Sequence, residues 1–435
     1  GLSERSNAFL DVFEKVLGRY GRRLGNENAV DFEDLINQAA EQIESGLWQV
    51  PYRYVLVDEF QDISANRMAL IAALKRAGTA YFLVGDDWQS INRFAGSDVA
   101  LVRDCGKHLG YVRECYLGTT FRYRTGILVP SAAFVQRNPE QTQRRLRTTS
   151  TAPDHGITVV AEASQKVGVV TALEHIHERE RAETAGDGQR RVSVLALGRY
   201  RRSRDAVDAQ RDRDLQLEFS TIHSAKGRDA DYVLVLDLKN NQYGLPSQIN
   251  DDPLLELVLP SRRTPAFPHA EERRLFYVAM TRAKRGVYLI ADSHQPSSFV
   301  EELIRKHPDI ARIGPGGLAR NDSPTCPRCG GRLVKSQSGK NLRCGNHPLC
   351  GHMAPRCTAC NRGYVLVDAG RSVCTTDACA TSPRVCPRCG AGILTRKSGP
   401  HGPFHGCSEY LAEPPCGYTE PIYGPGRQKD RGATV

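Results

Sequence analysis

The cysteines constrain the fold of this chain more than any other feature of its sequence. Twelve of the fourteen lie after residue 325, and only Cys105 and Cys115 precede them. They form three sets of four: Cys326, Cys329, Cys344, Cys350; Cys357, Cys360, Cys374, Cys379; and Cys386, Cys389, Cys407, Cys416. Each set opens with C-x-x-C and closes with a second pair, which is the spacing of a tetrahedral zinc site. The sets recur about every thirty residues, which predicts three small zinc ribbons folded around Zn²⁺.

Disulfides explain these cysteines less well, because the first residues lack the order of a signal peptide and no apolar run could span a bilayer. We therefore expect a cytoplasmic protein without a membrane partner. From Cys326 onward the chain carries 15 Lys and Arg against 6 Asp and Glu. Three zinc ions, each held by four thiolates, would lower this net charge from +9 to about +3. Charge alone is thus a modest argument for nucleic-acid binding.

A different pattern fills the first three hundred residues. Strand-like runs such as YRYVLVDEF, AYFLVGDD and DYVLVLDL alternate with amphipathic helical segments. This alternation predicts an α/β fold with parallel sheets, whose ligands bind beyond the carboxyl ends of the strands. Carboxylates at such ends can hold Mg²⁺ and deprotonate a water that attacks a γ-phosphate. The acids so placed are Asp58, Glu59, Asp86 and Asp87. Asp62 and Ser64 have a simpler alternative, since either can cap a following helix.

Five segments occur in the order of motifs II to VI of one helicase superfamily. They are VLVDEFQD, LVGDDWQSINRFAGSD, LGTTFRYRTG, STIHSAKGRDADYV and EERRLFYVAMTRAKR. The stretch from ENAVDFEDLI to MTRAKRGVYLIAD resembles the UvrD/Rep-type superfamily 1 DNA helicases, and within them the bacterial helicase IV group. This resemblance implies RecA-like P-loop NTPase motor domains, the first of them incomplete. The last ribbon, CPRCGAGILTRKSGPHGPFHGCSEY, is similar to the type IA topoisomerase ribbons that bind single-stranded DNA.

The resemblance to helicases also implies roles for individual residues. Those for ATP hydrolysis are Asp58 as Mg²⁺ ligand, Glu59 as general base, Gln61 and Gln89 as γ-phosphate sensors, Arg122 and Arg282 as arginines that close on the γ-phosphate, and Asp229 as ribose contact. Those for DNA are Thr221, His223 and Gly227, with Trp88 or Phe94 stacking on a base. Arginine suits the phosphate contacts because its guanidinium is planar and permanently charged.

Structural roles are the alternative for three of these residues. Arg282 shares a helical pattern with Arg273 and Arg285, and an arginine in such a pattern usually belongs to a solvated or salt-bridged face. Phe94 can be an ordinary core residue, and His223 can be a hydrogen-bonded structural histidine. The ribbons likewise have an alternative role as a purely structural or protein-docking array.

The chain departs from the family pattern in three places. Asn92 stands where the family usually has tyrosine, which removes a stacking group. Asp229 stands where the family usually has glutamate, which shortens the reach of the carboxylate. No G-x-x-x-x-G-K-[ST] loop, which would cradle the β- and γ-phosphates, occurs in the sequence. We therefore expect the C-terminal part of a helicase, as a fragment or a truncated product, which alone does not hydrolyse ATP at a helicase-like rate.

The predicted domains are a helical remainder of an accessory region (1–45), the end of the first motor domain (46–120), the second motor domain (121–300), a linker (301–323), three ribbons (324–421) and a disordered tail (422–435). The expected function is ATP-driven 3′-to-5′ translocation on single-stranded DNA with duplex unwinding, at the nucleoid, using ATP, Mg²⁺ and Zn²⁺. The alternative is an ATP-independent adaptor, in which a degenerate motor half and the ribbons bind DNA or a partner protein. Motifs II, V and VI favour the helicase for the parent protein, whereas the missing loop favours the adaptor for this chain.

Overall fold

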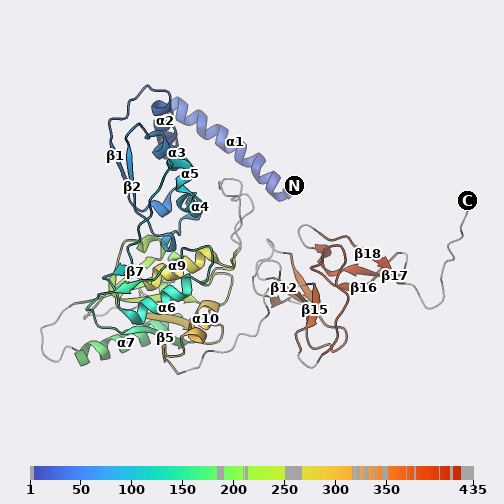
Figure 1. Ribbon diagram of the computed structural model, residues 1–435. Coiled ribbons are helices and arrows are strands. Elements are labelled where there is room, and N and C mark those ends of the chain that lie inside the picture. Colours follow the sequence, from blue (N-terminus) through green and yellow to red (C-terminus); the bar gives the residue numbers. More distant parts are fainter. Residues whose placement is uncertain are drawn as a thin grey trace, which may run out of the picture. The chain divides into compact units, whose positions relative to one another are not determined.

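The computed structural model divides the chain into two compact units, which we describe separately (Figure 1). Unit 1 comprises residues 1–247 and 251–320, and unit 2 comprises residues 248–250 and 321–435. The structure describes residues 4–183, 191–208, 210, 214–249, 267–315, 318, 324, 326–327, 333–336, 339, 341–344, 351–368, 370–376, 379–400, 402–411 and 415–422. Within these ranges, every helix falls short of the length and apolar character that a membrane crossing requires.

Unit 1 begins with helices and a small parallel sheet. The elements are α1 (Glu4–Glu27), α2 (Phe32–Glu44), β1 (Tyr54–Val57), α3 (Ala65–Ala73), β2 (Ala80–Leu83), α4 (Val99–Arg103) and α5 (Cys105–Leu109). A capping box starts α2, because Asp31 and Asp34 each accept a hydrogen bond from the other's backbone N–H. β1 and β2 pair in parallel, so their carboxyl ends meet at one edge. A small core of Phe60, Met68, Ile71 and Leu101 supports that edge.

The larger sheet of unit 1 has six strands, all paired in parallel, in the order β10-β5-β9-β8-β6-β7. Its strands are β5 (Gly156–Glu162), β6 (Val192–Gly198), β7 (Leu215–Thr221), β8 (Ala230–Leu238), β9 (Ala283–Asp292) and β10 (Ala311–Ile313). Its helices are α6 (Thr125–Val135), α7 (Gln165–Glu183), α9 (Ala270–Met280) and α10 (Ser298–Lys306). The two-residue strands β3 (Thr119–Thr120) and β4 (Arg147–Thr148) form a separate parallel pair.

Helices cover both faces of this sheet, as the apolar strand runs predict. Every residue of β8 is buried, and its side chains alternate between two cores. Val233 and Val235 pack with residues of α6, α9 and α10, whereas Tyr232 and Leu234 pack with residues of α7. A strand that is apolar on both faces therefore marks the centre of a covered parallel sheet. The α/β fold expected from the sequence is confirmed.

The sheet continues beyond the predicted boundary at residue 300. α10 begins at Ser298, and β10 pairs with β5 from Ala311 to Ile313 within the range assigned to a linker. Phe299 and Leu303 of α10 are buried in the main core. β10 was not predicted, because an edge strand of three residues is too short to show a recognisable apolar run. The other predicted boundaries stay predictions, and residues 423–435 of the predicted tail lie outside the described residues.

Unit 2 consists of short antiparallel hairpins. β11 (Leu333–Lys335), β12 (Asn341–Cys344) and β13 (Met353–Pro355) form the first sheet. β14 (Val365–Asp368) and β15 (Arg371–Cys374) form the second, and β16 (Leu394–Gly399), β17 (Gly402–Cys407) and β18 (Thr419–Pro421) form the third. Each sheet belongs to one cysteine set and has a core of three to five buried residues, which include two or three cysteines of that set. Such small cores agree with metal-dependent folding.

Candidate functional site

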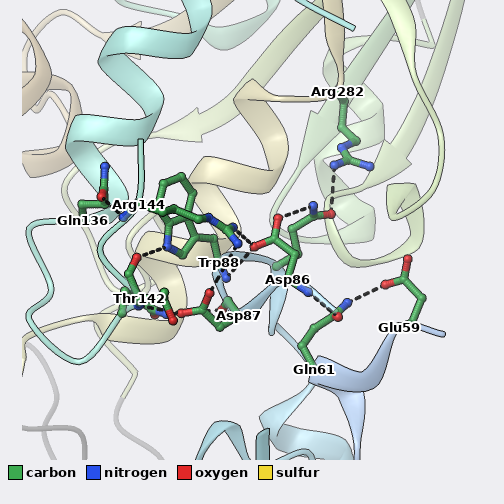
Figure 2. A network of polar contacts seen from close by, with 11 residues as sticks. Glu59, Gln61, Asp86, Asp87, Trp88, Gln136, Thr142, Arg144 and Arg282 are labelled. Carbon is green, nitrogen blue, oxygen red and sulfur yellow. Dashed lines mark hydrogen bonds and ion pairs between the residues drawn. The ribbon is translucent and has the colours of Figure 1, made fainter. Parts of the chain in front are cut away.

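The acids predicted at strand ends follow the carboxyl ends of the parallel strands β1 and β2, and Figure 2 shows three of them, Glu59, Asp86 and Asp87. Glu59 follows β1 in the left-handed conformation, with φ of 51°, and its backbone N–H donates to Asp58 Oδ1 over 2.8 Å. Gln61, which is 1% exposed, donates to Glu59 Oε2 over 2.5 Å. Its carbonyl oxygen accepts from the Asp86 backbone N–H over 2.8 Å. Gln61 thus connects the acids that follow the two strands.

Gly85 makes this connection possible. A Cβ atom at residue 85 would lie 2.8 Å from Gln61 Oε1 and 3.0 Å from the Gln61 backbone nitrogen. Those distances are shorter than ordinary van der Waals contacts, so any side chain there would displace Gln61. Close packing against Gln61 therefore explains why a glycine precedes Asp86.

The contacts then cross from the small sheet to the six-stranded part of unit 1 (Figure 2). Gln89 Nε2 donates to Asp86 Oδ2 over 2.7 Å, and Arg282 Nη2 donates to Gln89 Oε1 over 3.1 Å. Arg282 lies just after α9 and is 2% exposed. Burial and the neighbouring Arg122 guanidinium lower the pKa of Arg282, although an arginine stays charged in proteins. One chain of hydrogen bonds thus links Glu59 with Arg282.

Arg282 differs from the two arginines that share its sequence pattern. Arg273 makes two contacts with Glu302, of 2.7 and 2.9 Å, and its guanidinium lies 4.1 Å from the centre of the Phe134 ring. Arg285 pairs with Glu180 over 2.7 Å and also with Glu183. Those two arginines bind glutamates of α10 and α7, which pack on the six-stranded sheet. Arg282 instead binds Gln89, which follows β2.

Arg122 and Asp229, both assigned to the nucleotide by resemblance, lie beside each other. Arg122 Nε is 3.5 Å from Asp229 Oδ2, and Arg122 Nη1 donates to the Thr281 carbonyl over 3.2 Å. Lys284 Nζ lies 2.7 Å from the other Asp229 oxygen. Both side chains are about one-third exposed, so a ligand can reach them.

Lys226 is a residue of this site that the sequence did not single out. Its Nζ lies 2.9 Å from Glu59 Oε2 and 2.5 Å from Asp62 Oδ2. Burial opposes the ionisation of Glu59, but the hydrogen bond and charge of Lys226 hold the pKa of Glu59 below its usual value. Asp62 therefore binds a lysine instead of capping α3, and Ser64, at the N-cap position, makes no side-chain capping bond.

The residues assigned to DNA gather near Lys226. Thr221 ends β7, His223 begins a 3₁₀ turn, and Gly227 has a φ of 82°, which a residue with a side chain adopts only under strain. The Phe94 ring is 68% exposed and meets the His223 ring edge-on, with centroids 5.5 Å apart. Burial and the charge of Arg199 lower the pKa of His223 to about 4, so the imidazole is neutral at pH 7.

Trp88 occupies a very different environment from Phe94. It is completely buried and donates to the Thr142 carbonyl over 3.0 Å (Figure 2). It also packs edge-on against Tyr277, with ring centroids 5.3 Å apart. A base has no access to a ring in that position. Of the two aromatic residues predicted to stack on a base, Phe94 is the one at the surface.

Arg144 is a second residue that sequence reasoning missed. It forms an ion pair with Asp86, lies 3.9 Å from Asp87, and stacks over Trp88 with 4.2 Å to the ring centre (Figure 2). Asp87 Oδ2 also accepts from the Thr142 backbone N–H over 2.8 Å. Nothing in the run QRRLR distinguishes Arg144 from its neighbours, because its partners lie more than fifty residues away.

The cysteines of the second and third sets form two compact groups. In each group the four Sγ atoms lie within 4.8 Å of one another. The hydrogen-bonded Sγ pairs are 3.6 to 3.8 Å apart, and a tetrahedral Zn²⁺ with bonds of about 2.3 Å needs sulfurs about 3.8 Å apart. Backbone N–H groups, chiefly that of Gly363, lower the pKa of Cys360 to about 6, which favours the thiolate that metals bind. These residues therefore fit zinc.

The first set is tested only in part. Cys329 and Cys350 lie outside the described residues. Cys326 and Cys344 are buried in one small core with Leu333, Leu342 and Ala354. A four-cysteine site at the first set stays a prediction.

Comparisons with known proteins identify the two halves of unit 1. Residues 2–109 match the family model described as UvrD/REP helicase N-terminal domain, and residues 200–294 match the UvrD-like helicase C-terminal domain. DNA helicase IV of Escherichia coli is 38% identical over 291 residues, which are 66% of this chain and 40% of that protein. A probable DNA helicase of Mycoplasma pneumoniae is 26% identical over 313 residues, covering 67% of this chain and 55% of that protein. The ATP-dependent DNA helicase Rep of Escherichia coli is 28% identical over 141 residues, which are 31% of this chain and 21% of Rep.

Proposed function

The chain carries the N- and C-terminal domains of UvrD-like helicases, and from that premise we propose that it forms part of an ATP-dependent DNA helicase. The proposed activity is 3′-to-5′ translocation on single-stranded DNA, coupled to duplex unwinding. The chain spans 40% of the length of helicase IV and 55% of the length of the Mycoplasma pneumoniae helicase. The observation that carries it is the continuous chain of hydrogen bonds from Glu59 to Arg282, which links the residues after β1 and β2 with a residue just after α9.

This arrangement supports the catalytic roles assigned by resemblance. When bound, ATP with Mg²⁺ supplies the γ-phosphate that water attacks. Asp58 would hold the Mg²⁺, and Glu59 would accept the proton of the attacking water. Gln61 and Gln89 would position Glu59 and Arg282 relative to each other, because each of these glutamines bonds to Asp86.

Arg122 would bind the γ-phosphate oxygens together with Arg282. In this structure its partner is Asp229, proposed as the ribose contact, at 3.5 Å. A doubly charged phosphate competes well for this arginine, which is one-third exposed, since a guanidinium can make two parallel hydrogen bonds to phosphate but here has one long contact with a carboxylate. We expect Arg122 to leave Asp229 as the nucleotide binds, which frees Asp229 for the ribose.

DNA would bind along Phe94 and the turn from Thr221 to Gly227. Lys226 lies in that turn and contacts Glu59, so one short segment touches both the proposed DNA side and the proposed general base. A DNA-induced shift of the turn would therefore change the environment of Glu59. This link gives ATP hydrolysis a route to respond to DNA.

We also propose Zn²⁺ at the second and third cysteine sets and, by analogy of spacing, at the first. The ribbons would bind single-stranded DNA through exposed aromatic and basic residues. Tyr410 is 50% exposed, and Lys397 Nζ lies 3.3 Å from the centre of its ring. A flat ring beside a cation suits a base and its phosphate. Docking of a protein partner is the alternative use of the same surface.

The ribbon proposal is tested with a labelled single-stranded oligonucleotide and the whole chain. Tyr410→Ala is expected to weaken binding about ten-fold, since one base stack contributes about 1–3 kcal/mol. Tyr111→Ala is the matched control, because Tyr111 is 96% exposed but lies in unit 1. Equal affinities for the wild type and the Tyr410 variant would remove DNA from the list of ribbon ligands and favour protein docking.

The chain of 435 residues is proposed not to hydrolyse ATP on its own, because its sequence holds no phosphate loop. ATP turnover is measured with and without single-stranded DNA, for the wild type and for Glu59→Gln. Background rates in all four samples are expected. DNA-stimulated turnover that disappears in the Glu59 variant would refute this part of the proposal.

The helicase and the adaptor are separated by the native protein in its source. An antibody raised against residues 379–411 captures the native form for mass determination and an ATPase assay. A species well above 48.1 kDa with DNA-stimulated ATPase supports the helicase. A species of 48.1 kDa without ATPase activity supports an ATP-independent adaptor and overturns the helicase proposal.

A further inference from the structure

The three cysteine modules of unit 2 pack on one another rather than standing apart. Tyr364 and Leu366 of the second module pack against the small core of the first. Ile393 of the third module is buried within the core of the second. These contacts connect neighbours along the chain, as expected for modules in series.

One contact instead joins the first module directly to the third. His352 Nδ1 lies 3.0 Å from Glu409 Oε1, and their side chains are 3% and 4% exposed. His352 precedes β13, and Glu409 lies in the 3₁₀ turn Ser408–Leu411 after β17. The two atoms lack the alignment of a hydrogen bond, so the contact is an ion contact or a closely packed polar pair. Burying such a pair costs desolvation free energy, so its presence indicates that the contact has a role.

The backbones of both residues form hydrogen bonds with cysteines of the proposed metal sites. The Cys344 N–H donates to the His352 carbonyl over 3.0 Å. On the other side, the Glu409 N–H donates to Cys407 Sγ over 3.4 Å, and the Glu409 carbonyl accepts from the Cys416 N–H over 3.0 Å. The pair therefore lies between a cysteine of the first set and two cysteines of the third.

Gly392 shows that the third module is shaped around Glu409. A Cβ atom at residue 392 would lie 2.8 Å from Glu409 Cγ and 2.7 Å from Cys407 Sγ. The glycine leaves room for the carboxylate chain and the thiolate side by side. Residues that orient metal ligands in this way typically change metal affinity 10- to 100-fold when they are replaced.

We propose that His352 and Glu409 are positioning residues through which the first module supports the metal site of the third. The inference rests on the proposed zinc sites, and it adds that the third site holds its metal tightly only while His352 supports Glu409. In consequence, a change in the first module at His352 reaches the third site directly, without passing through the second module.

The test measures zinc release from the whole chain to a chromogenic chelator. The kinetic phase of the third site is identified by its loss in a Cys389→Ser chain. Glu409→Ala and His352→Ala are both expected to accelerate that phase about 10-fold. Glu409→Gln is expected to stay within about two-fold of the wild type, because its amide oxygen still faces His352.

Glu420→Ala is the matched control. Glu420 also pairs with a histidine, His405, at 3.4 Å and with Arg384 at 2.7 Å, but both partners lie in the third module. It is expected to leave the phase within about two-fold of the wild type. A purely structural effect of losing any carboxylate pair would move the control as well.

The outcomes separate this inference from the zinc proposal. A wild-type chain with no bound zinc refutes the metal sites and the coupling together. Zinc bound at the third site, with an unchanged third-site phase in His352→Ala, overturns the coupling alone. Acceleration by Glu409→Ala equal to that by Glu420→Ala also overturns it. If His352→Ala does not fold, His352→Gln is measured in its place, and the same rates decide.

Discussion

Removing the Arg144 guanidinium is expected to destabilise unit 1 strongly. Arg144 is 18% exposed in its side chain, Asp86 is 26% exposed and Asp87 is 7% exposed. Arg144→Ala leaves two carboxylates that keep only hydrogen bonds from neighbouring N–H groups. Breaking a buried pair costs about 3–5 kcal/mol, and the lost stacking on Trp88 adds about 0.5–2 kcal/mol. Because Asp86 is partly solvated, we expect a loss of about 3 kcal/mol.

Urea unfolding followed by tryptophan fluorescence measures this loss. The only two tryptophans of the chain, Trp48 and Trp88, lie in unit 1, so the signal excludes the cysteine-rich unit. Arg23→Ala is the control, because Arg23 pairs with Glu27 on an exposed helix face, and it should cost under about 0.5 kcal/mol. Arg144→Lys keeps the charge and should lose about half as much as Arg144→Ala. A loss below about 1 kcal/mol for Arg144→Ala would refute the assigned role of the pair.

Three further predictions use the same chain. The pKa of about 4 for His223 lies below the ordinary value of 6.5, so the unfolded state takes up a proton first as the pH falls. Stability should therefore decrease from pH 6.5 to pH 4 by at most about 1.4 kcal/mol per unit, and His223→Asn should flatten that slope in urea titrations. Lys226→Met should cost about 2 kcal/mol, because Asp62 loses its cation, and Lys226→Arg should recover part; equal midpoints for all three chains would contradict the contact. Zinc chelation should abolish the circular dichroism of unit 2 without moving the tryptophan signal, and a coincident loss of both would show that the units fold together.

The sequence predicted the architecture because its signals are local. β8 is buried over all nine residues, and the run YVLVL between its two aspartates is apolar on both faces, which is typical of the centre of a covered sheet. The cysteine sets likewise indicate metal sites from local sequence, since C-x-x-C places two thiolates on one tight turn. The family models confirm the helicase domains that the five ordered motifs indicated.

Local sequence patterns did not distinguish residues of the same chemical type from one another. The helical pattern did not separate Arg282 from Arg273 and Arg285, and only the resemblance to helicases singled it out. Phe94 and Trp88 stayed alternatives. The structure separates them by their partners, because Arg282 reaches Gln89 from 193 positions away and Trp88 is enclosed by Thr142 and Tyr277. These partners come from distant segments, which no local pattern encodes.

The sequence by itself determined the parallel sheet, the strand-end acids and the cysteine sets, which depend on spacings of a few residues. Only the tertiary structure decided which charges meet: Lys226 with Glu59, Arg144 with Asp86, and His352 with Glu409. The sequence around a lysine, arginine or histidine does not identify its partner. In the unfolded chain water satisfies the hydrogen bonds of such a side chain, and a carboxylate from a distant segment takes that place only when folding removes the water. Burial, which is a property of the whole fold, gives those residues their roles.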